Sequence, residues 1–466
     1  MFVGRKNELS LLEEMYLSDR FEFLVLYGRR RVGKTELLSE FARQHKDDTV
    51  YFSALQRNNP LNLEDFSKMI QMHFDQRYIA PFPDWEAGFI YYGDKVSERR
   101  QILIIDEFPF LAEPDPLIMS ILQHLIDHVW KKKNIMFVLC GSNISYMEKE
   151  VIGQNAPLFG RTTSQLELRS FDYLDSGAFF PDYSNVDKLI AYGILGGIPR
   201  YLNEFEDSIS IRKNLERHLL RNGAFLKDEP LVFLRMETRE SAIYNSIITA
   251  ISEGINTPVR IGGRIHEDRA KVSKYLLTLQ NLRLVERCVP CGESEKSKNA
   301  IYKIKDNFFR FWYRFAFSNR NYYDLLGPEA ASEDIEKNLS DYMGLAFESI
   351  CKEYLVRLAK EGELPFVPYY LDKWWGTNPV LKAQDDVDLL GLSKDGKLGI
   401  FCECKFKNNK FVMEDYDDTL NAVKAFPDMQ KYYLYFFSKS GFTDSVRSRA
   451  AEEGAHLIEI DDLFQV

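Results

Sequence analysis

Short apolar runs that end in polar residues alternate with amphipathic stretches in the first part of the chain. Residues 21–27, FEFLVLY, are apolar and rich in β-forming side chains, so they predict a buried strand. QILIIDEFPFL (101–111) and NIMFVLCGSN (134–143) predict two further strands, and the periodic run TELLSEFARQ (35–44) predicts a helix. This pattern indicates an α/β fold.

The loop between the first strand and that helix has the spacing expected of a phosphate cradle. It reads GRRRVGKT, in the pattern G-x-x-x-x-G-K-T. Glycines let backbone N–H groups curl around phosphates, and the N-terminus of a helix adds partial positive charge. Lys34 is expected to reach the β- and γ-phosphates, and the Thr35 hydroxyl to ligate Mg²⁺. The predicted ATP-binding residues are Gly28, Arg29, Arg30, Arg31, Val32, Gly33, Lys34, Thr35 and Glu36.

The next two predicted strands end in residues suited to ATP hydrolysis. Asp106 would hold the shell of Mg²⁺, and Glu107 would orient or deprotonate the attacking water. Ser142 and Asn143 follow the third strand, where a sensor of the γ-phosphate would lie. We therefore expect a P-loop core that hydrolyses ATP with Mg²⁺.

Several motifs, taken in order, resemble the AAA+-related STAND-type ATPases of archaea and many bacteria. They are FVGRKNEL, GRRRVGKT, IIDEF, LCGSN, PLFGR (157–161) and GGIP (196–199). The resemblance covers residues 1–235 and implies a helical lid in which Pro199 lies near the nucleotide. It also implies that Val3-Gly4-Arg5 lies near the base and that Arg161 senses phosphate, in its own chain or on a neighbour. The alternative for Arg161 is an ordinary surface arginine.

Residues 239–306 predict a winged helix. Val272, Tyr275, Leu276 and Leu279 recur at helical spacing and form a core-facing stripe. Between residues 255 and 305, eleven Lys or Arg stand against five Asp or Glu, a local charge of +6 in a chain of −10. This contrast favours binding of double-stranded DNA, whereas many winged helices serve in packing or protein interaction instead. Off the stripe lie Arg269, Lys271, Ser273, Lys274 and Thr278.

The C-terminal part contains a predicted β-hairpin that decides the chemistry of FCECKFK (401–407). Asp395-Gly396 is a two-residue turn signal, and a tight turn makes the numbers of paired residues sum to 791. Asp388 then lies opposite Glu403, on one face with Lys405, while Cys402 and Cys404 point to the other side. A four-residue turn would change the pairing but leave Asp388 and Glu403 on the same face of the hairpin. A three-residue turn would put them on opposite faces. Paired carboxylates suit Mg²⁺ or Mn²⁺, so a soft-metal site built from the cysteines is disfavoured.

Asp388 followed by Glu403-Cys404-Lys405 resembles the core of the PD-(D/E)XK nuclease superfamily, over residues 336–466. The resemblance implies that Asp388 and Glu403 hold metal and that Lys405 positions or polarises water. Glu348, on a preceding helix, would complete the acidic site. The alternative is an inherited fold that no longer cuts.

The composition of the chain bears on its location in the cell and on zinc binding, and a polar stretch bears on its domain limits. No window is apolar over the length of a membrane span, the N-terminus has no apolar signal segment, and six scattered cysteines favour a reducing cytoplasm. Cys288-x-x-Cys291 supplies only two of the four ligands that structural zinc needs. His124 and His128 have Leu125 where a zinc protease would carry its glutamate, so they are interpreted as ordinary helix residues. The polar stretch 330–340 predicts a boundary. We expect a P-loop core (1–170), a helical lid (171–237), a winged helix (238–306), a linker (307–335) and a nuclease-like α/β domain (336–466).

The sequence thus favours a cytoplasmic ATPase whose nucleotide state governs a DNA-binding winged helix and a nuclease-like domain. Two alternatives stay open: an ATP-gated signalling switch with protein partners and a silent nuclease fold, and an ATPase of recombination or mobile elements. Oligomeric state is not decided by the sequence.

Overall fold

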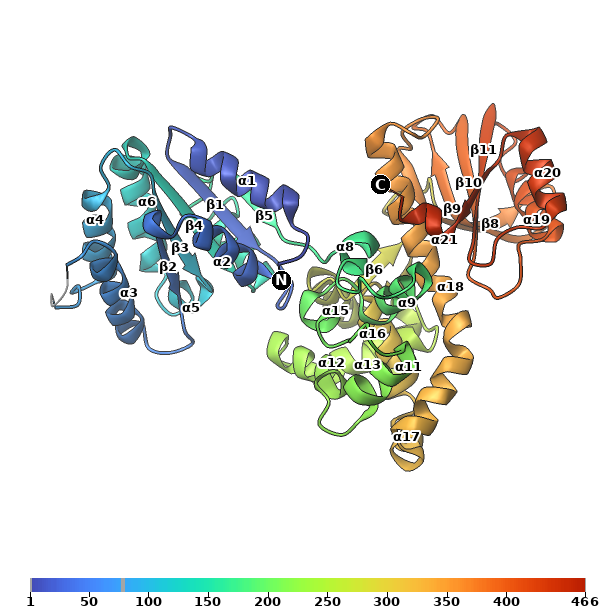
Figure 1. Ribbon diagram of the computed structural model, residues 1–466, viewed down its shortest axis with the longest axis horizontal. Coiled ribbons are helices and arrows are strands. Elements are labelled where there is room, and N and C mark those ends of the chain that lie inside the picture. Colours follow the sequence, from blue (N-terminus) through green and yellow to red (C-terminus); the bar gives the residue numbers. More distant parts are fainter. Residues whose placement is uncertain (1, 77–79, 466) are drawn as a thin grey trace. The chain divides into compact units, whose positions relative to one another are not determined.

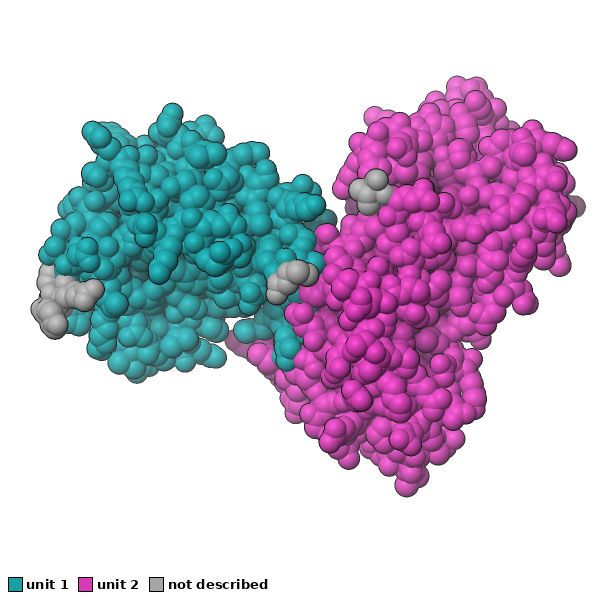
Figure 2. All heavy atoms as spheres, in the orientation of Figure 1, with its two compact units in different colours: residues 1–170, 198–200 teal, residues 171–197, 201–466 magenta. Residues whose placement is uncertain are grey.

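The computed structural model describes residues 2–76 and 80–465 (Figure 1). The described part of the chain divides into two compact units, drawn in different colours in Figure 2. Unit 1 comprises residues 1–170 with 198–200, and unit 2 comprises residues 171–197 with 201–466. Among the described residues, none of the helices has the length and apolar character that crossing a membrane requires.

Unit 1 is an α/β layer structure around a parallel sheet, as the sequence predicts. Its strand order is β2-β3-β4-β1-β5, so β4 separates the strand before the phosphate loop from the strand that ends in Asp106. Strands β1, β3 and β4 are buried almost throughout because helices cover both faces of a parallel sheet. The strands are β1 (Glu22–Tyr27), β2 (Thr49–Ser53), β3 (Gln101–Asp106), β4 (Ile135–Gly141) and β5 (Ser164–Glu167).

The helices of unit 1 follow the strands in the alternating order predicted. Aromatic and aliphatic side chains of α3, α4 and α6 pack on β2 and β3 to form the largest part of this core. The helices are α1 (Lys6–Leu17), α2 (Lys34–Gln44), α3 (Asn59–His73), α4 (Trp85–Lys95), α5 (Pro109–Ala112), α6 (Leu117–His128) and α7 (Ile144–Tyr146).

The first part of unit 2 is helical and ends in a small antiparallel sheet. Between residues 241 and 304 three helices precede two paired strands, and the predicted stripe Val272, Tyr275, Leu276 and Leu279 is buried. The elements are α8 (Tyr173–Gly177), α9 (Asn185–Leu195), α10 (Pro199–Leu202, whose first two residues belong to unit 1), α11 (Ile211–Asn214), α12 (Phe225–Glu237), α13 (Ser241–Ser252), α14 (Pro258–Ile265), α15 (Arg269–Asn281), β6 (Val285–Cys288) and β7 (Ile301–Ile304).

The segment 307–335, predicted to be a linker, is helical, and its aromatic residues pack inside unit 2. Its aromatic residues form α16 (Asn307–Phe311), a π-helical segment (Trp312–Phe317) and α17 (Arg320–Leu326), and most of them are buried. The polar stretch 330–340 lies inside α18 (Pro328–Glu361), which continues from the helical region to the C-terminal sheet (Figure 1). Ala331, Ser332 and Ile335 share its buried face, so the polarity of the sequence there reflects the solvent-facing side of a helix.

The C-terminal part of unit 2 is a mixed sheet in the order β12-β11-β10-β9-β8. Pairs β8–β9 and β9–β10 are antiparallel, while β10–β11 and β11–β12 are parallel. The elements are β8 (Tyr370–Asn378), β9 (Ala383–Leu392), β10 (Leu398–Lys405), α19 (Met413–Val423), β11 (Lys431–Ser438), α20 (Asp444–Glu453), β12 (His456–Glu459) and α21 (Ile460–Leu463).

Candidate functional site

The phosphate loop of unit 1 folds around its own lysine. Lys34 is the first residue of α2, and its Nζ donates to the carbonyl oxygens of Gly28 at 2.8 Å and Arg29 at 3.1 Å. Burial lowers the pKa of the Lys34 ammonium, against the opposing charges of Glu107 and Asp106. A buried cation held by neutral carbonyls is suited to accept an anion.

Two neighbours of the phosphate loop show how closely it is packed. A Cβ on Gly28 would lie 2.4 Å from the carbonyl oxygen of Leu168, so the backbone of the loop approaches the residue after β5 too closely for a side chain. The ring of Pro199 lies 3.6 Å from the position that a Cβ on Gly33 would take. Pro199 is therefore next to the loop, where the sequence expected it. Arg29 and Val32 are buried, whereas Thr35 and Glu36 are exposed.

Asp106, at the carboxyl end of β3, is held by three hydrogen bonds. Its Oδ2 accepts from the Thr35 hydroxyl and from the Tyr51 hydroxyl, both at 2.8 Å, and its Oδ1 accepts from the backbone N–H of Glu107 at 2.9 Å. The structure thus brings together the two residues predicted to serve Mg²⁺. Tyr51, on β2, was missed, because nothing in its sequence neighbourhood marks it as a partner of the acidic strand.

Glu107 is tied to the end of the neighbouring strand. Its Oε2 accepts from the Ser142 hydroxyl at 2.8 Å and from the Ser142 backbone N–H at 3.3 Å. Its backbone is left-handed, with φ of 53°, a conformation uncommon for a residue with a side chain. The sheet order explains the contact, because β4 lies directly beside β3.

Arg161 is placed elsewhere in unit 1. Its guanidinium pairs with Asp127 of α6 at 2.6 Å and donates to the carbonyl oxygens of Pro157 and Phe159, both at 3.0 Å. These contacts do not join it to Lys34 or Glu107. Arg5 donates to the carbonyl oxygen of Val32 at 3.0 Å, so the N-terminal segment does lie against the loop.

The second group of predicted residues lies on the hairpin of β9 and β10. Paired residues from Gly399 with Leu392 to Cys402 with Leu389 keep the predicted register. The predicted tight turn is wrong: the strands end at Leu392 and begin again at Leu398. The turn is wider because the Ser393 and Asp395 side chains bond backbone N–H groups within it.

The regular pairing of β9 with β10 ends at Leu389 and Cys402, and beyond it the Asp388 side chain bonds the neighbouring strand. Its Oδ2 accepts from the backbone N–H of Cys404 at 3.0 Å, which brings its carboxylate beside Glu403. Burial, and then the charge of Asp388, raise the pKa of Glu403 to about 7. Lys405 bonds Glu403 and lies 3.6 Å from Asp415 of α19. The predicted neighbours are therefore together.

Glu348 of α18 joins this group through a lysine that the sequence did not indicate. Lys373 of β8 places its Nζ 3.3 Å from Glu348 Oε1, 3.2 Å from Asp388 Oδ1 and 3.1 Å from Asp386 Oδ2. Burial, and then the charge of Asp388, raise the pKa of Glu348, while Lys373 opposes the rise. We call the set Glu348, Asp386, Asp388 and Glu403 the acidic cluster.

The donor chemistry of the acidic cluster fits a hard cation only in part. Carboxylate oxygens of Asp388 and Glu403 are the ligands that Mg²⁺ and Mn²⁺ prefer. Both carboxylates already have a lysine in contact. Within residues 2–76 and 80–465, no group of three or more His, Cys, Asp or Glu is arranged to hold a metal ion.

The cysteines of FCECKFK are packing residues. Cys402 and Cys404 are buried, and Cys404 contacts Cys351 of α18, on the side away from Glu403. Burial raises the pKa of the Cys404 thiol well above its usual range. Cys291 donates from Sγ to the carbonyl oxygen of Leu390 at 2.9 Å, and burial raises its pKa to about 12. Neither pair behaves as a soft-metal site.

Charged residues of α15 divide into paired and exposed groups. Lys271 bonds Glu267 at 2.9 Å, whereas Arg269 and Lys274 are exposed.

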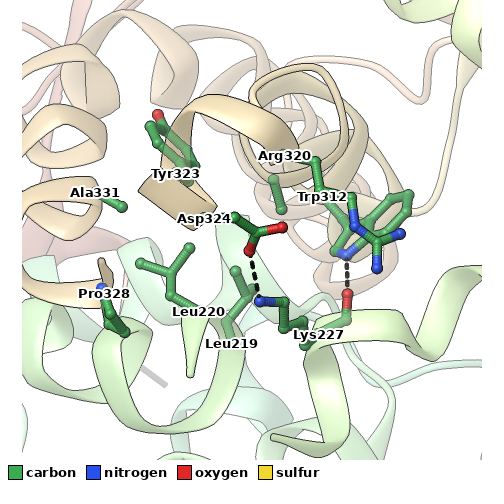
Figure 3. A pocket seen from close by; sticks show the side chains of 10 residues that line it. Leu219, Leu220, Lys227, Trp312, Arg320, Tyr323, Asp324, Pro328 and Ala331 are labelled. Carbon is green, nitrogen blue, oxygen red and sulfur yellow. Dashed lines mark hydrogen bonds and ion pairs between the residues drawn. The ribbon is translucent and has the colours of Figure 1, made fainter. Parts of the chain in front are cut away.

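A small pocket elsewhere in unit 2 involves neither the acidic cluster nor α15 (Figure 3). The Lys227 ammonium crosses the pocket to Asp324 at 2.9 Å, and the Lys227 backbone carbonyl oxygen accepts from Trp312 Nε1 at 2.8 Å, so these polar groups bond one another.

Comparison with known proteins places the chain in a family. The model of an ATPase domain found predominantly in Archaea matches residues 2–205, and a model of archaeal and bacterial proteins of unknown function matches residues 312–416. An uncharacterized protein of Methanocaldococcus jannaschii is 31% identical over 440 residues, 93% of this chain and 94% of the relative.

Two further proteins are similar over shorter parts. An uncharacterized ATP-binding protein of Pyrococcus abyssi is 23% identical over 294 residues, 58% of this chain and 84% of that protein. The solved structure of a Walker-type ATPase of Pyrococcus abyssi covers 67% of this chain and 96% of its own, with a TM-score of 0.48 and 18% identity. From the family matches and the relative from Methanocaldococcus, the chain belongs to an archaeal family of ATP-binding ATPases.

Proposed function

We propose that the chain hydrolyses ATP with Mg²⁺ and that its nucleotide state governs a DNA-binding module and the acidic cluster. The observation that carries the first part is the Thr35–Asp106 hydrogen bond beside the buried Lys34. A phosphate loop, a hydroxyl and an acidic strand end are what Mg²⁺–ATP requires.

Each candidate residue of unit 1 would have its own role in binding and hydrolysing ATP. Lys34 would exchange the carbonyls of Gly28 and Arg29 for phosphate oxygens. Thr35 and Asp106 would hold Mg²⁺, which neutralises charge on the phosphates, and Tyr51 keeps the Asp106 carboxylate oriented. Glu107 would turn from Ser142 to the attacking water, and Ser142 would then be available to the γ-phosphate.

Hydrolysis and binding can be separated at Glu107. We expect Glu107→Gln to bind ATP as the wild type does and to lower kcat by about a hundredfold or more, because a group that orients or deprotonates the water is removed. The measurement is steady-state phosphate release with Mg²⁺ and with EDTA, beside Glu113→Gln as a matched control. Unchanged kcat in Glu107→Gln would contradict the role.

The DNA part of the proposal rests on residues 241–304, which we interpret as a winged helix. Helices α13, α14 and α15 followed by the β6–β7 hairpin have the order of that fold, and the segment carries the excess of basic residues. Arg269 and Lys274 are the exposed cations of α15. Lys271 is a weaker candidate, because it is paired with Glu267.

Salt dependence tests this interface. The double variant Arg269→Ala/Lys274→Ala should weaken duplex binding and lower the slope of log K against log salt by roughly 2. Lys337→Ala/Lys360→Ala, which removes two exposed lysines of α18, is the matched control. A slope equal to that of the wild type would count against α15 as the DNA-contacting helix.

For the C-terminal domain we propose a PD-(D/E)XK-like site that acts on phosphodiesters. Support comes from Asp388 beside Glu403 and Lys405, with Glu348 close by.

One observation favours a second candidate, an ATP-gated switch whose nuclease fold is silent: Lys373 already compensates the negative charge of the acidic cluster. Plasmid and branched DNA, incubated with Mg²⁺ or Mn²⁺ with and without ATP, discriminate the two. Cleavage that Asp388→Ala abolishes supports the nuclease, and intact DNA throughout supports the switch.

A further inference from the structure

Lys373 occupies the position in the acidic cluster where a cation is required. Its Nζ lies within 3.3 Å of oxygens from Glu348, Asp386 and Asp388, residues supplied by two different elements. The side chains of Lys373 and Asp388 are 22% and 14% exposed, so solvent screens this contact less than an ordinary surface ion pair. Lys373 therefore serves the cluster as a built-in counter-ion.

A local irregularity of β8 directs Lys373 into the cluster. The register of β8 against β9 shifts between Asp372 and Trp374, which leaves Lys373 outside the regular pairing. Its backbone N–H donates to its neighbour Asp372 Oδ1 at 2.9 Å. Its carbonyl oxygen accepts from the backbone N–H of Cys291 at 3.0 Å. Such a bulge re-aims one side chain, here toward Asp388.

An ammonium and a metal ion would need the same oxygen atom. Asp388 Oδ2 already accepts from Cys404 N–H, so Oδ1 is the oxygen that faces a cation, and Lys373 bonds it. Two cations in contact with one carboxylate oxygen repel each other strongly at this separation. Metal could enter only if Lys373 moved away.

We propose that Lys373 is an internal competitor of divalent metal at the acidic cluster, so that metal binding requires its displacement. The inference rests on the metal site suggested under the proposed function and adds its regulation. The segment after β6 could displace Lys373, because it is bonded to β8 and β9. The Cys291 backbone N–H donates to the Lys373 carbonyl oxygen, and the Cys291 Sγ donates to the Leu390 carbonyl oxygen. DNA that moved the hairpin of the basic module would act on Lys373 through this segment.

The test is Mn²⁺ binding to the full chain without nucleotide, followed by electron paramagnetic resonance of free Mn²⁺. Lys373→Met keeps the length of the side chain and removes the charge, so it should bind Mn²⁺ roughly tenfold more tightly than the wild type. Lys352→Met is the matched control, since Lys352 pairs with Asp372 at 2.8 Å outside the cluster, and it should bind as the wild type does. Equal or weaker binding by Lys373→Met would overturn the inference.

A second variant keeps the inference testable if Lys373→Met folds poorly. Asp386 is 59% exposed and holds Lys373 at 3.1 Å, so Asp386→Asn should fold, loosen the lysine and tighten Mn²⁺ binding by a smaller factor. Weaker binding in Asp386→Asn would overturn the inference as well. Duplex DNA should tighten Mn²⁺ binding in the wild type and have no such effect in Lys373→Met.

Asp388→Asn separates failure of the inference from failure of the proposed site. If Asp388→Asn weakens Mn²⁺ binding but Lys373→Met does not strengthen it, the metal site stands and the competition is refuted. If tight binding in Lys373→Met persists when Asp388→Asn is added, Mn²⁺ binds elsewhere and the proposed metal site itself is refuted.

Discussion

The phosphate loop and the acidic cluster each contain a largely buried lysine, but the two lysines have opposite surroundings. Lys34 is held by neutral carbonyl oxygens of its own loop, which it can exchange for phosphate at little electrostatic cost. Lys373 is held by carboxylates of Glu348, Asp386 and Asp388, which it neutralises. The loop is thus prepared for an anion, while the cluster is already compensated.

This difference shows why matching residues alone do not define a working site. Both regions contain the residue types that their motifs require, in the expected order. What separates them is the charge balance, which depends on residues contributed by distant parts of the chain. Three predictions test this comparison, beginning with the largest effect.

Lys34→Ala should weaken ATP binding by about a hundredfold, because charge-assisted contacts to the phosphates are lost and no nearby cation of the loop has the same position. Binding of a fluorescent ATP analogue measures the effect, and Lys46→Ala, an exposed lysine of the same unit, is the control. ATP affinity within a factor of three of the wild type would remove the distinction drawn between the two lysines.

Glu353 of α18 is a buried acid whose two hydrogen-bond donors are neutral, in contrast to the acids that surround Lys373. Its carboxylate accepts from the Tyr192 hydroxyl at 2.7 Å and from the Tyr173 backbone N–H at 3.1 Å. Burial raises its pKa from 4.5 to about 7, although these hydrogen bonds and the charge of Lys305 lower it, while Asp172 adds to the rise.

A pKa raised by folding stabilises the protein below the unfolded pKa, and this stability is lost as pH rises through the folded pKa. Relative to Glu353→Gln, the wild type should therefore lose about 2 kcal/mol of unfolding free energy between pH 5 and pH 8. Urea unfolding at intervals of pH measures the difference, with Glu361→Gln of the same helix as control. A difference that does not vary with pH would contradict the raised pKa.

Tyr51→Phe should raise the Mg²⁺ concentration for half-maximal ATP hydrolysis by about fivefold, because Asp106 loses one of the donors that orient it. Tyr91→Phe is the matched control, since the buried Tyr91 hydroxyl has no hydrogen-bond partner among the described residues. An unchanged Mg²⁺ requirement would leave Tyr51 as a packing residue of β2.

Much of the phosphate loop could be predicted because its parts are contiguous in sequence. Gly28 to Thr35 specify a loop and a helix start by themselves, and Asp106 is recognisable at the end of an apolar strand. The register of β9 against β10 was also predictable as far as the pair Leu389 and Cys402, because the strand period determines it locally. Beyond that pair, the hydrogen bond from the Cys404 N–H places Asp388, and the sequence does not show it.

Tyr51 and Lys373 could not be predicted, because their roles arise from contacts between strands and at a bulge that no local pattern marks. The polar stretch 330–340 predicts a boundary, but it lies inside α18, for a related reason. A helix that is polar on one face reads as a boundary until the packing of Ala331 and Ile335 shows which face is buried.

The most direct test of the account is whether nucleotide state changes DNA binding. Fluorescence anisotropy of a labelled duplex would be followed with Glu107→Gln in Mg²⁺–ATP, with the wild type in Mg²⁺–ADP, and with both proteins without nucleotide. The account predicts that duplex affinity differs by about fivefold or more between the ATP and ADP states. The same affinity in all states would contradict it, and would leave an ATPase whose hydrolysis is not coupled to DNA.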